Sequence, residues 1–446
     1  MHRIKEIKYL GKWVLILLPI SAIIGAAIAF FIWSLQAVTQ LRIENPWLLF
    51  LLPIIGVLIV WSYRQFSKDS EKGNNLIMDE IHNPGGGVPG KMGPLVFIGT
   101  ILTHLFGGSA GREGTAVQIG GSISAFIGKR LHLQENEMRI LLISGVAAGF
   151  GAVFGTPLTG AIFALEVLAI GRIQYDAIIP ALMASILADL TASALGAGHA
   201  DYAILFQSQT TIFDANIKVD PLLMIKVIIA CIAFGLAAFL FGEMTHRIKD
   251  LGNKYIKNAY LIPLIGGLLV IGITFLYGNY DYNGLGVYSY RDGGVSILSS
   301  FQEEGANAWS WLQKLGLTAV TLGSGFKGGE VTPLFFVGAT LGNALGELMD
   351  APIDLFAGLG FIAVFAAATN TPLACTIMGI ELFGSDNILY YAIACFVAYY
   401  FSGHTGIYSS QKVAIPKLFD YKRDVEATLG DLRKNDRKNT PFRKKR

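Results

Sequence analysis

The chain has 446 residues, of which 53% are hydrophobic and 15% are charged, with a mean hydropathy of +0.51 and a formal net charge of +3. This composition is typical of an integral membrane protein. The small net charge argues against nucleic acid as a partner. The three cysteines, Cys231, Cys375 and Cys395, lie far apart in apolar sequence. They predict small buried side chains rather than a metal site, and we expect no cofactor.

The first predicted element is a membrane span. Residues 13–33 form an uncharged 21-residue stretch with Trp13 and Trp33 at its ends. This length crosses the hydrocarbon core, and tryptophan favours the two interfaces. Basic residues cluster before the span and again in the tail, which ends Arg443-Lys-Lys-Arg446. We therefore expect residues 1–12 and 416–446 to be cytoplasmic basic segments, with the tail near anionic lipid headgroups.

Further apolar stretches predict an all-α membrane domain from residue 13 to residue 415. In chain order they lie near residues 46–62, 94–106, 114–128, 139–170, 176–197, 221–243, 259–277, 310–323, 331–349, 354–383 and 388–402. Several are too short, or too often interrupted by glycine and proline, to be simple spans. The polar stretches between them are too short for a soluble domain, so we predict a single membrane domain.

An internal repeat divides this domain into halves near residues 45–200 and 221–410. Residues 156–166 read TPLTGAIFALE and residues 371–381 read TPLACTIMGIE, at an offset of 215. Earlier in each half, residues 111–115 read GREGT and residues 328–332 read GGEVT, at an offset of 217. Repeats interrupted by glycine at corresponding positions are typical of transporters whose ion site lies near the membrane midplane.

Each glycine-rich break carries a carboxylate, Glu113 in the first and Glu330 in the second. A carboxylate within membrane-spanning sequence is costly and by default marks an ion pathway or a proton relay. For Glu113 the structural alternative is a buried side chain paired with Arg112. Glu166 and Glu381 end matching helices, and a structural or interface role is the simpler interpretation for both.

Enzymatic interpretations have little support. A G-x-S-x-G pattern at residues 107–111 would suit an intramembrane hydrolase, but no strand precedes it and glycine is frequent throughout the chain. His104 and His404 could transfer protons, although local hydrogen bonds explain them more simply. We predict that the protein is not an enzyme.

These motifs resemble those of the CLC family of anion channels and proton-coupled transporters. The resemblance rests on residues 111–120, 323–325 and 329–333 and on Tyr408, and it runs from about residue 10 to residue 415. It implies a helical homodimer with one pore per subunit, built from two inverted repeats with broken and re-entrant helices. It also implies that Glu113 is a gate that occupies the anion site when ionised and leaves it when protonated.

Four departures from the common CLC pattern are similar to the fluoride/proton antiporter branch. Asn74 stands where chloride-handling members have an anion-coordinating serine, and Thr115 replaces a proline after Arg-Glu-Gly. Val331 and Thr332 replace a phenylalanine and a small residue in the second anion-binding loop. Val167 stands at the position of the glutamate that relays protons on the cytoplasmic side.

The resemblance and the donor chemistry together predict the anion site. Fluoride is small and tightly hydrated, so a dry site must replace its water with several hydrogen-bond donors. Such donors are offered by side chains or backbone N–H groups of Asn74, Gly114, Thr115, Val331, Thr332 and Tyr408. Helix capping is an equally good interpretation of Thr115 and Thr332.

We therefore expect a multi-pass protein of a bacterial cell membrane that exports fluoride in exchange for protons and so gives fluoride resistance. Two other transport classes stay open, namely a chloride/proton exchanger and a passive anion channel. An exchanger would need the serine and the inner glutamate, which this chain lacks. A channel usually lacks the gating carboxylate, which is present here as Glu113.

Overall fold

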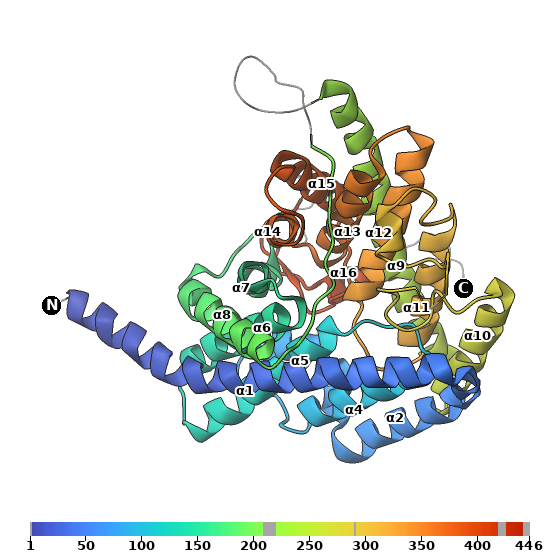
Figure 1. Ribbon diagram of the computed structural model, residues 1–446. Helices are drawn as coiled ribbons and strands as arrows, with labels where there is room; N and C mark the ends of the chain where they lie inside the picture. Colours follow the sequence, from blue (N-terminus) through green and yellow to red (C-terminus); the bar gives the residue numbers. More distant parts are fainter. Residues whose placement is uncertain (1, 208–219, 290, 418–424, 440–446) are drawn as a thin grey trace.

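The computed structural model describes residues 2–207, 220–289, 291–417 and 425–439 (Figure 1), so the basic end Arg443–Arg446 lies outside the described residues. The fold is helical, as predicted. Its α-helices are α1 (His2–Glu44), α2 (Leu52–Phe66), α3 (Asn74–His82), α4 (Met92–Leu105), α5 (Glu113–Arg130), α6 (Glu135–Phe154), α7 (Pro157–Glu166), α8 (Ile178–Ala194), α9 (Pro221–Tyr255), α10 (Leu261–Tyr277), α11 (Ser310–Gly323), α12 (Val331–Leu348), α13 (Ile353–Thr369), α14 (Pro372–Phe383), α15 (Ile388–Phe401) and α16 (Leu429–Asn439).

Short elements complete the described chain. The 3-10 helices are η1 (Pro46–Leu51), η2 (Lys68–Lys72), η3 (Tyr175–Ala177) and η4 (Ser299–Phe301), and the strands β1 (Ala169–Ile170) and β2 (Lys412–Val413) pair in parallel. Among the described residues, six helical segments are long and apolar enough to cross a membrane: Ile7–Glu44, Pro46–Phe66, Glu135–Phe154, Tyr175–Ala194, Pro221–Tyr255 and Val331–Leu348.

The first helix is much longer than the predicted span. α1 runs along one side of the molecule from His2 to Glu44 (Figure 1), whereas the apolar stretch covers only residues 13–33. Trp33 is 43% exposed, as expected of a residue at an interface. Trp13 is only 1% exposed. Its ring packs inside the protein, so it is not the lipid-facing anchor that the sequence suggested.

The same chain break separates two helices in each half. α6 is followed by Gly155 and α13 by Asn370, both in the left-handed region at φ values of 72° and 58°. A threonine-proline pair follows in both cases, and Pro157 and Pro372 begin α7 and α14. The left-handed residue stops one helix, and proline starts the next because it has a helical φ and no N–H left unsatisfied. The repeat in the sequence is thus a repeat of local structure.

Small residues let the central helices of each half approach closely. A Cβ on Gly120 of α5 would collide with the carbonyl oxygen of Gly145 of α6. In the second half, a Cβ on Gly338 of α12 would collide with the carbonyl oxygen of Gly360 of α13. Close backbone packing of this kind is how helices associate where lipid supplies no hydrophobic driving force. It fixes α5 and α12, whose first residues carry the candidate site.

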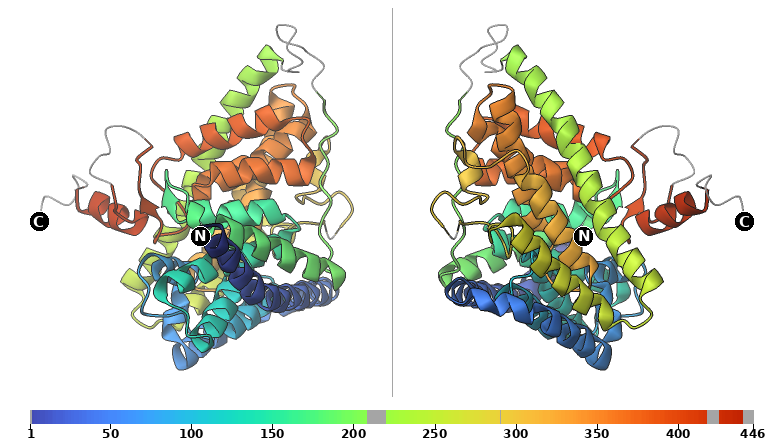
Figure 2. Two further views of the ribbon diagram at one scale, coloured as in Figure 1. Left: turned by 90° about the vertical axis from the view of Figure 1, so that its left-hand side faces the viewer. Right: turned by 90° about the vertical axis from the view of Figure 1, so that its right-hand side faces the viewer.

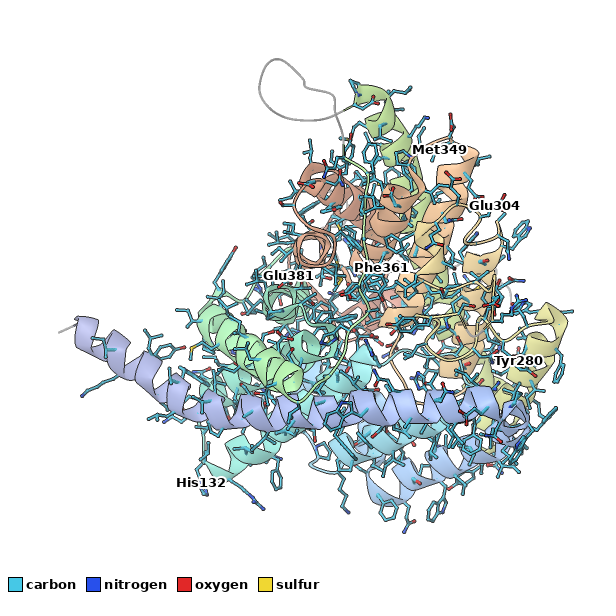
Figure 3. All side chains as sticks on the ribbon, viewed as in Figure 1. His132, Tyr280, Glu304, Met349, Phe361 and Glu381 are labelled. Carbon is cyan, nitrogen blue, oxygen red and sulfur yellow. The ribbon has the colours of Figure 1, made fainter. Side chains whose placement is uncertain are left out.

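Two carboxylates join α7 and α14 reciprocally. Glu166, the last residue of α7, accepts hydrogen bonds of 3.1 and 2.8 Å from the N–H groups of residues 373 and 374 in the first turn of α14. Glu381 of α14 (Figure 3) accepts hydrogen bonds of 2.9 and 2.8 Å from the N–H groups of residues 158 and 159 in the first turn of α7. Each carboxylate therefore caps the helix of the other half. These contacts fit the structural interpretation of both residues.

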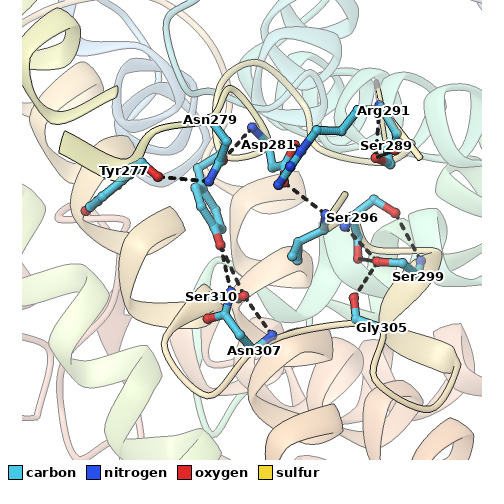
Figure 4. A network of polar contacts seen from close by, with 12 residues as sticks. Tyr277, Asn279, Asp281, Ser289, Arg291, Ser296, Ser299, Gly305, Asn307 and Ser310 are labelled. Carbon is cyan, nitrogen blue, oxygen red and sulfur yellow. Dashed lines mark hydrogen bonds and ion pairs between the residues drawn. The ribbon is translucent and has the colours of Figure 1, made fainter. Parts of the chain in front are cut away.

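The connection from α10 to α11 is held by its own polar network (Figure 4). Arg291 donates to Asp281 from Nε at 3.1 Å and from Nη2 at 2.8 Å, and Asp281 also accepts the Val295 N–H at 3.1 Å. The same connection reaches the segment before α5, because the Asn283 amide donates to the Gly107 carbonyl at 2.7 Å. It therefore secures the chain that leads into the site.

The chain after residue 416 is part of the folded body where the structure describes it. Figure 2 shows α16 at the edge of the helical body. The N–H groups of Leu429 and Gly430 donate to the carbonyls of Gln411 and Ser409, both at 2.9 Å. Arg433 of α16 lies 3.3 Å from a carboxylate oxygen of Glu243 on α9. This return of the chain was not expected from a basic tail.

Candidate functional site

The two glycine-rich breaks meet face to face. The N–H of Gly111 donates to the Gly329 carbonyl at 2.6 Å, and the N–H of Gly329 donates to the Gly111 carbonyl at 2.7 Å. α5 begins at Glu113 and α12 at Val331, as the sequence predicted. The N-termini of these helices therefore converge on one place. Such ends carry partial positive charge and free N–H donors, which suits them to an anion.

The carboxylate of Glu113 fills this place. It is 1% exposed and accepts the Thr332 N–H at 3.0 Å and the Thr332 hydroxyl at 2.7 Å from either oxygen. The N–H of Arg112 adds a donor at 3.2 Å. The carboxyl group of an α5 side chain thus occupies the N-terminal end of α12.

Arg112 is a secondary partner of this carboxylate. Its Nε lies 3.6 Å from a Glu113 oxygen, so the ion pair considered in the structural alternative does exist. That distance is longer than each of the Thr332 bonds, and a charge-assisted hydrogen bond weakens steeply with distance. Thr332, rather than Arg112, makes the shorter contacts with the Glu113 carboxyl group.

The two candidate threonines have different surroundings. Thr332 faces Glu113, whereas the Thr115 hydroxyl lies 2.7 Å from the hydroxyl of Thr100 on α4 and is fully buried. Neither is an N-cap, because α5 and α12 are preceded by Arg112 and Glu330, whose side chains make no capping bond. The capping interpretation is therefore wrong for both, and the Thr115 hydroxyl is directed to α4 rather than to the carboxylate.

Asn74 and Glu330 reach Gly114, and Tyr408 is next to Asn74. From the place that a Gly114 Cβ would occupy, the Asn74 amide nitrogen is 3.2 Å away and a Glu330 oxygen is 3.6 Å away. Tyr408 is 5% exposed, and its hydroxyl interacts with the Asn74 side chain. The absence of a side chain at Gly114 lets these polar groups reach the first turn of α5. Val331, 1% exposed, contributes the start of α12.

A cavity of about 260 Å³ opens beside this group and is lined by Asn74, Glu330 and Tyr408. Glu113 is not among the lining residues, so the cavity ends at these three side chains and the gate candidate is closed off from it. Sequence reasoning missed the cations that share the cavity wall. The signal for one of them, Lys327, was present, because a lysine inside a glycine-rich membrane segment is as unusual as a glutamate.

The remaining polar predictions concern local structure. The two ring nitrogens of His104 lie 2.8 Å from the Thr100 carbonyl and 3.0 Å from the Ala110 carbonyl, which confirms local hydrogen bonding. The three cysteines are buried and unpaired, as predicted. Within the described residues, no group of His, Cys, Asp and Glu side chains could hold a metal ion.

Comparison with known proteins places this geometry in a family. The family model described as voltage gated chloride channel matches residues 55–403. The chain belongs to the CLC family. A curated CLC relative from Pseudomonas syringae pv. tomato, described as a chloride/fluoride channel protein, is 44% identical over 410 residues, which is 92% of this chain and 88% of the relative.

Solved CLC structures agree with the fold. The crystal structure of a CLC-type fluoride/proton antiporter superposes with a TM-score of 0.83 and 35% sequence identity, covering 91% of this chain and 98% of that one. A slow cyanobacterial Cl⁻/H⁺ antiporter superposes with a TM-score of 0.72 at 20% identity, covering 87% and 94% of the two chains. The second likeness bears on the fold alone. The predicted CLC fold is confirmed.

Proposed function

We propose that this CLC protein is a secondary active transporter that exports fluoride in exchange for protons. The observation that carries the proposal is the Glu113 carboxylate, buried at the N-terminus of α12 where an anion would be favoured. A side chain in that position either holds the site or takes up a proton and leaves it. Proton transfer and anion movement then both depend on the Glu113 carboxyl group, and this dependence couples them.

The chemistry of the exchange follows from the donors around Glu113. Ionised, the carboxylate satisfies the Thr332 N–H and hydroxyl. Protonation removes the charge that makes these bonds strong, so the side chain can leave and an anion can take its donors. The backbone N–H groups of Gly114 and Val331 and the side chains of Asn74 and Tyr408 complete the proposed anion site. We assign Thr115 a supporting part, because its hydroxyl is engaged with Thr100.

Fluoride rather than chloride is the proposed substrate. Asn74 and Thr332 supply hydrogen-bond donors at positions where the common CLC pattern has other residues, and a strongly hydrated anion needs such donors. The relative described as a chloride/fluoride channel protein and the superposition on a fluoride/proton antiporter support the same choice. A chloride/proton exchanger is the second candidate and a passive anion channel the third. In each case the protein is an ion-transport protein rather than an enzyme.

We further propose that the protein works as a homodimer in a bacterial cell membrane, with both termini in the cytoplasm. Exposed apolar side chains occur on α7, α8, α14 and α15, among them Leu158, Leu190, Leu373 and Phe396, and α7 packs on α8 and α14 and α14 packs on α15. Exposed apolar side chains on neighbouring helices suit either lipid or a second copy. Mass measurement of the protein in detergent, before and after Leu190→Arg, tests the dimer. A mass of one chain for the unaltered protein contradicts it.

The function is tested in liposomes that contain the purified protein and are loaded with fluoride. Fluoride efflux should drive proton uptake against an imposed pH gradient, because the gate takes up a proton before it leaves the site to fluoride and must release that proton to the inside before it returns. Fluoride leaving without uphill proton movement would identify a channel. Proton uptake that follows a chloride gradient and ignores fluoride would identify a chloride/proton exchanger on the same fold.

A further inference from the structure

His104 has unusual surroundings near the end of α4. The residue is 2% exposed, its Nδ1 lies 2.8 Å from the Thr100 carbonyl oxygen, and its Nε2 lies 3.0 Å from the Ala110 carbonyl oxygen. A carbonyl oxygen can only accept a hydrogen bond, and a neutral imidazole has one N–H donor. Neutral His104 can therefore satisfy one of the two carbonyls. Only the imidazolium, with two N–H donors, can satisfy both.

The Ala110 carbonyl belongs to the segment that leads to the gate candidate. Gly111 follows Ala110 directly, and a Cβ added to Gly111 would lie 3.0 Å from a carboxyl oxygen of Glu113. The ring of His104 and the carboxyl group of Glu113 therefore lie near the same short piece of backbone. A proton on His104 is held about one residue away from the group that we propose to couple protons to anions.

A second cavity, here called the outer cavity, reaches His104. It has a volume of about 260 Å³. Its wall includes His104, Thr39 and Arg42 near the end of α1, and Asp281 and Arg291 of the connection drawn in Figure 4. A polar cavity of this size has room for several water molecules. Water in it can bring a proton to the ring.

The outer cavity and the cavity beside Asn74 lie toward opposite faces of the membrane. Pro46, before α2, and Gly278, after α10, line the outer cavity. Arg64, near the other end of α2, and Ile262, in the first turn of α10, line the cavity beside Asn74. With the termini in the cytoplasm, as we propose, the outer cavity is on the side from which protons enter.

The surroundings of His104 act on its proton in opposite directions. Burial and the basic residues Arg112 and Lys314 oppose a charged ring. Two hydrogen bonds from a charged donor favour it. In the wall of the outer cavity, Asp281 is paired with Arg291. A group under such opposed influences can gain and lose a proton, which is what proton transfer requires.

We propose that His104 is a proton relay between the outer cavity and Glu113. The proposal rests on the proposed transport function and adds the route by which external protons reach the gate. A hydronium ion in the cavity gives a proton to the neutral ring and leaves water. The imidazolium then gives a proton to the Glu113 carboxylate, which forms the carboxylic acid and restores the neutral ring. Because Gly111 lies between the two groups, this second step requires the gate side chain to turn toward the Ala110 carbonyl.

Two substitutions of His104 each keep one hydrogen bond but cannot carry a proton. The amide nitrogen of glutamine can replace Nε2, and that of asparagine can replace Nδ1. Near pH 7, His104→Gln and His104→Asn should both slow fluoride-driven proton uptake into liposomes, by roughly a hundredfold, with little change in the half-saturating fluoride concentration. His132→Asn replaces an exposed histidine and should keep the rate of the unaltered protein.

The external pH distinguishes a relay from a structural role. Without the relay, the gate must take its proton directly from hydronium. The residual rate of both His104 variants should therefore rise by about tenfold for each unit of external acidification. The unaltered protein should depend much less on external pH. A structural defect would instead lower the rate by the same factor at every pH.

A substitution in the wall of the outer cavity tests the route without changing His104. Thr39→Trp places an indole in this cavity and should slow proton uptake as the His104 variants do. Gln40→Trp makes a similar change at the exposed neighbouring residue, which does not line the cavity, and should leave the rate unchanged. If the His104 variants are not monodisperse in detergent, this pair carries the test.

Nitrogen NMR of histidine-labelled protein in lipid observes the ring directly and does not depend on transport. Acidification from about pH 8 to about pH 5 should convert the signal that His104→Gln lacks from a neutral to a doubly protonated ring. The proposal is overturned if this ring stays neutral, or if the His104 and Thr39 variants keep the rate and pH profile of the unaltered protein. Failure of the transport function looks different, because the unaltered protein then shows no fluoride-driven proton uptake. In that event a ring that stays neutral still refutes proton binding at His104.

Discussion

The contact between Glu113 and Thr332 determines what a neutral side chain at position 113 should do. Glutamine has the shape of glutamate but cannot ionise, so it can neither carry the proton nor make charge-assisted bonds to Thr332. We expect Glu113→Gln to abolish fluoride-driven proton uptake, measured as external alkalinisation of a weakly buffered liposome suspension. Glu135→Gln makes the same chemical change at an exposed site and should leave the coupling intact. Normal coupling in Glu113→Gln would exclude this residue as the gate.

Asn74 gives a second prediction at the scale of single residues. Its amide nitrogen is directed to the backbone at Gly114, next to Tyr408. Serine is shorter and offers one donor instead of two, so Asn74→Ser should narrow the preference for fluoride over chloride, by roughly tenfold, which is the effect of losing one hydrogen bond to a charged group. Parallel efflux measurements with two ion-selective electrodes give the ratio. An unchanged ratio would assign selectivity to Thr332 and the backbone donors.

Single residues were predictable where a side chain is unusual for its surroundings. Glu113 and Glu330 were found because carboxylates are rare in membrane-spanning sequence. The direction of a side chain was not predictable: Thr115 and Thr332 are equivalent in the sequence pattern, yet one hydroxyl meets Thr100 and the other meets Glu113. The two hydroxyls differ because a different helix packs beside each threonine. The sequence pattern does not reveal which helices are neighbours.

At the scale of elements, the reciprocal caps of α7 and α14 give a prediction about stability. Replacing Glu381 or Glu166 by glutamine keeps one acceptor oxygen but removes the charge that two backbone N–H groups share. Each variant should lose roughly 1–3 kcal/mol of unfolding free energy and melt at a lower temperature in detergent. Tryptophan fluorescence during heating measures this. The exposed Glu135→Gln again serves as the control, and equal melting temperatures for all three variants would contradict the capping role.

Element boundaries were predictable where backbone chemistry sets them. Pro157 and Pro372 begin α7 and α14 because proline fits only the first turn of a helix, and this chemistry divides the apolar stretches 139–170 and 354–383, which hydropathy alone left undivided. The ends of α1 were not predictable from hydropathy, because charged residues continue a helix as readily as apolar ones. α1 therefore extends well beyond its apolar centre, to His2 and Glu44. The caps between α7 and α14 also escaped prediction, since they join residues 207 and 223 positions apart.

At the scale of the whole molecule, the family resemblance in the sequence predicted the fold, and the comparisons confirm it. The resemblance ends near residue 415, and there the prediction also ends. Beyond it, the sequence suggested only a basic tail, whereas Leu429 and Arg433 bind the chain back to the body. Backbone bonds of this kind depend on a neighbour that the folded body supplies, and they leave no periodic signal in the sequence.

The reciprocal caps have a consequence for biosynthesis. When the ribosome has released the first half, the opening turn of α7 is already in the bilayer, but Glu381 has not yet been made. The N–H groups in the first turn of α7 stay without this acceptor until the second half inserts. In hydrocarbon each unsatisfied N–H group costs several kcal/mol. The N-terminal half alone therefore has unsatisfied hydrogen-bond donors in the membrane, and it needs a chaperone or lipid headgroups to cover them. Two separately expressed halves should consequently survive degradation together better than either does alone.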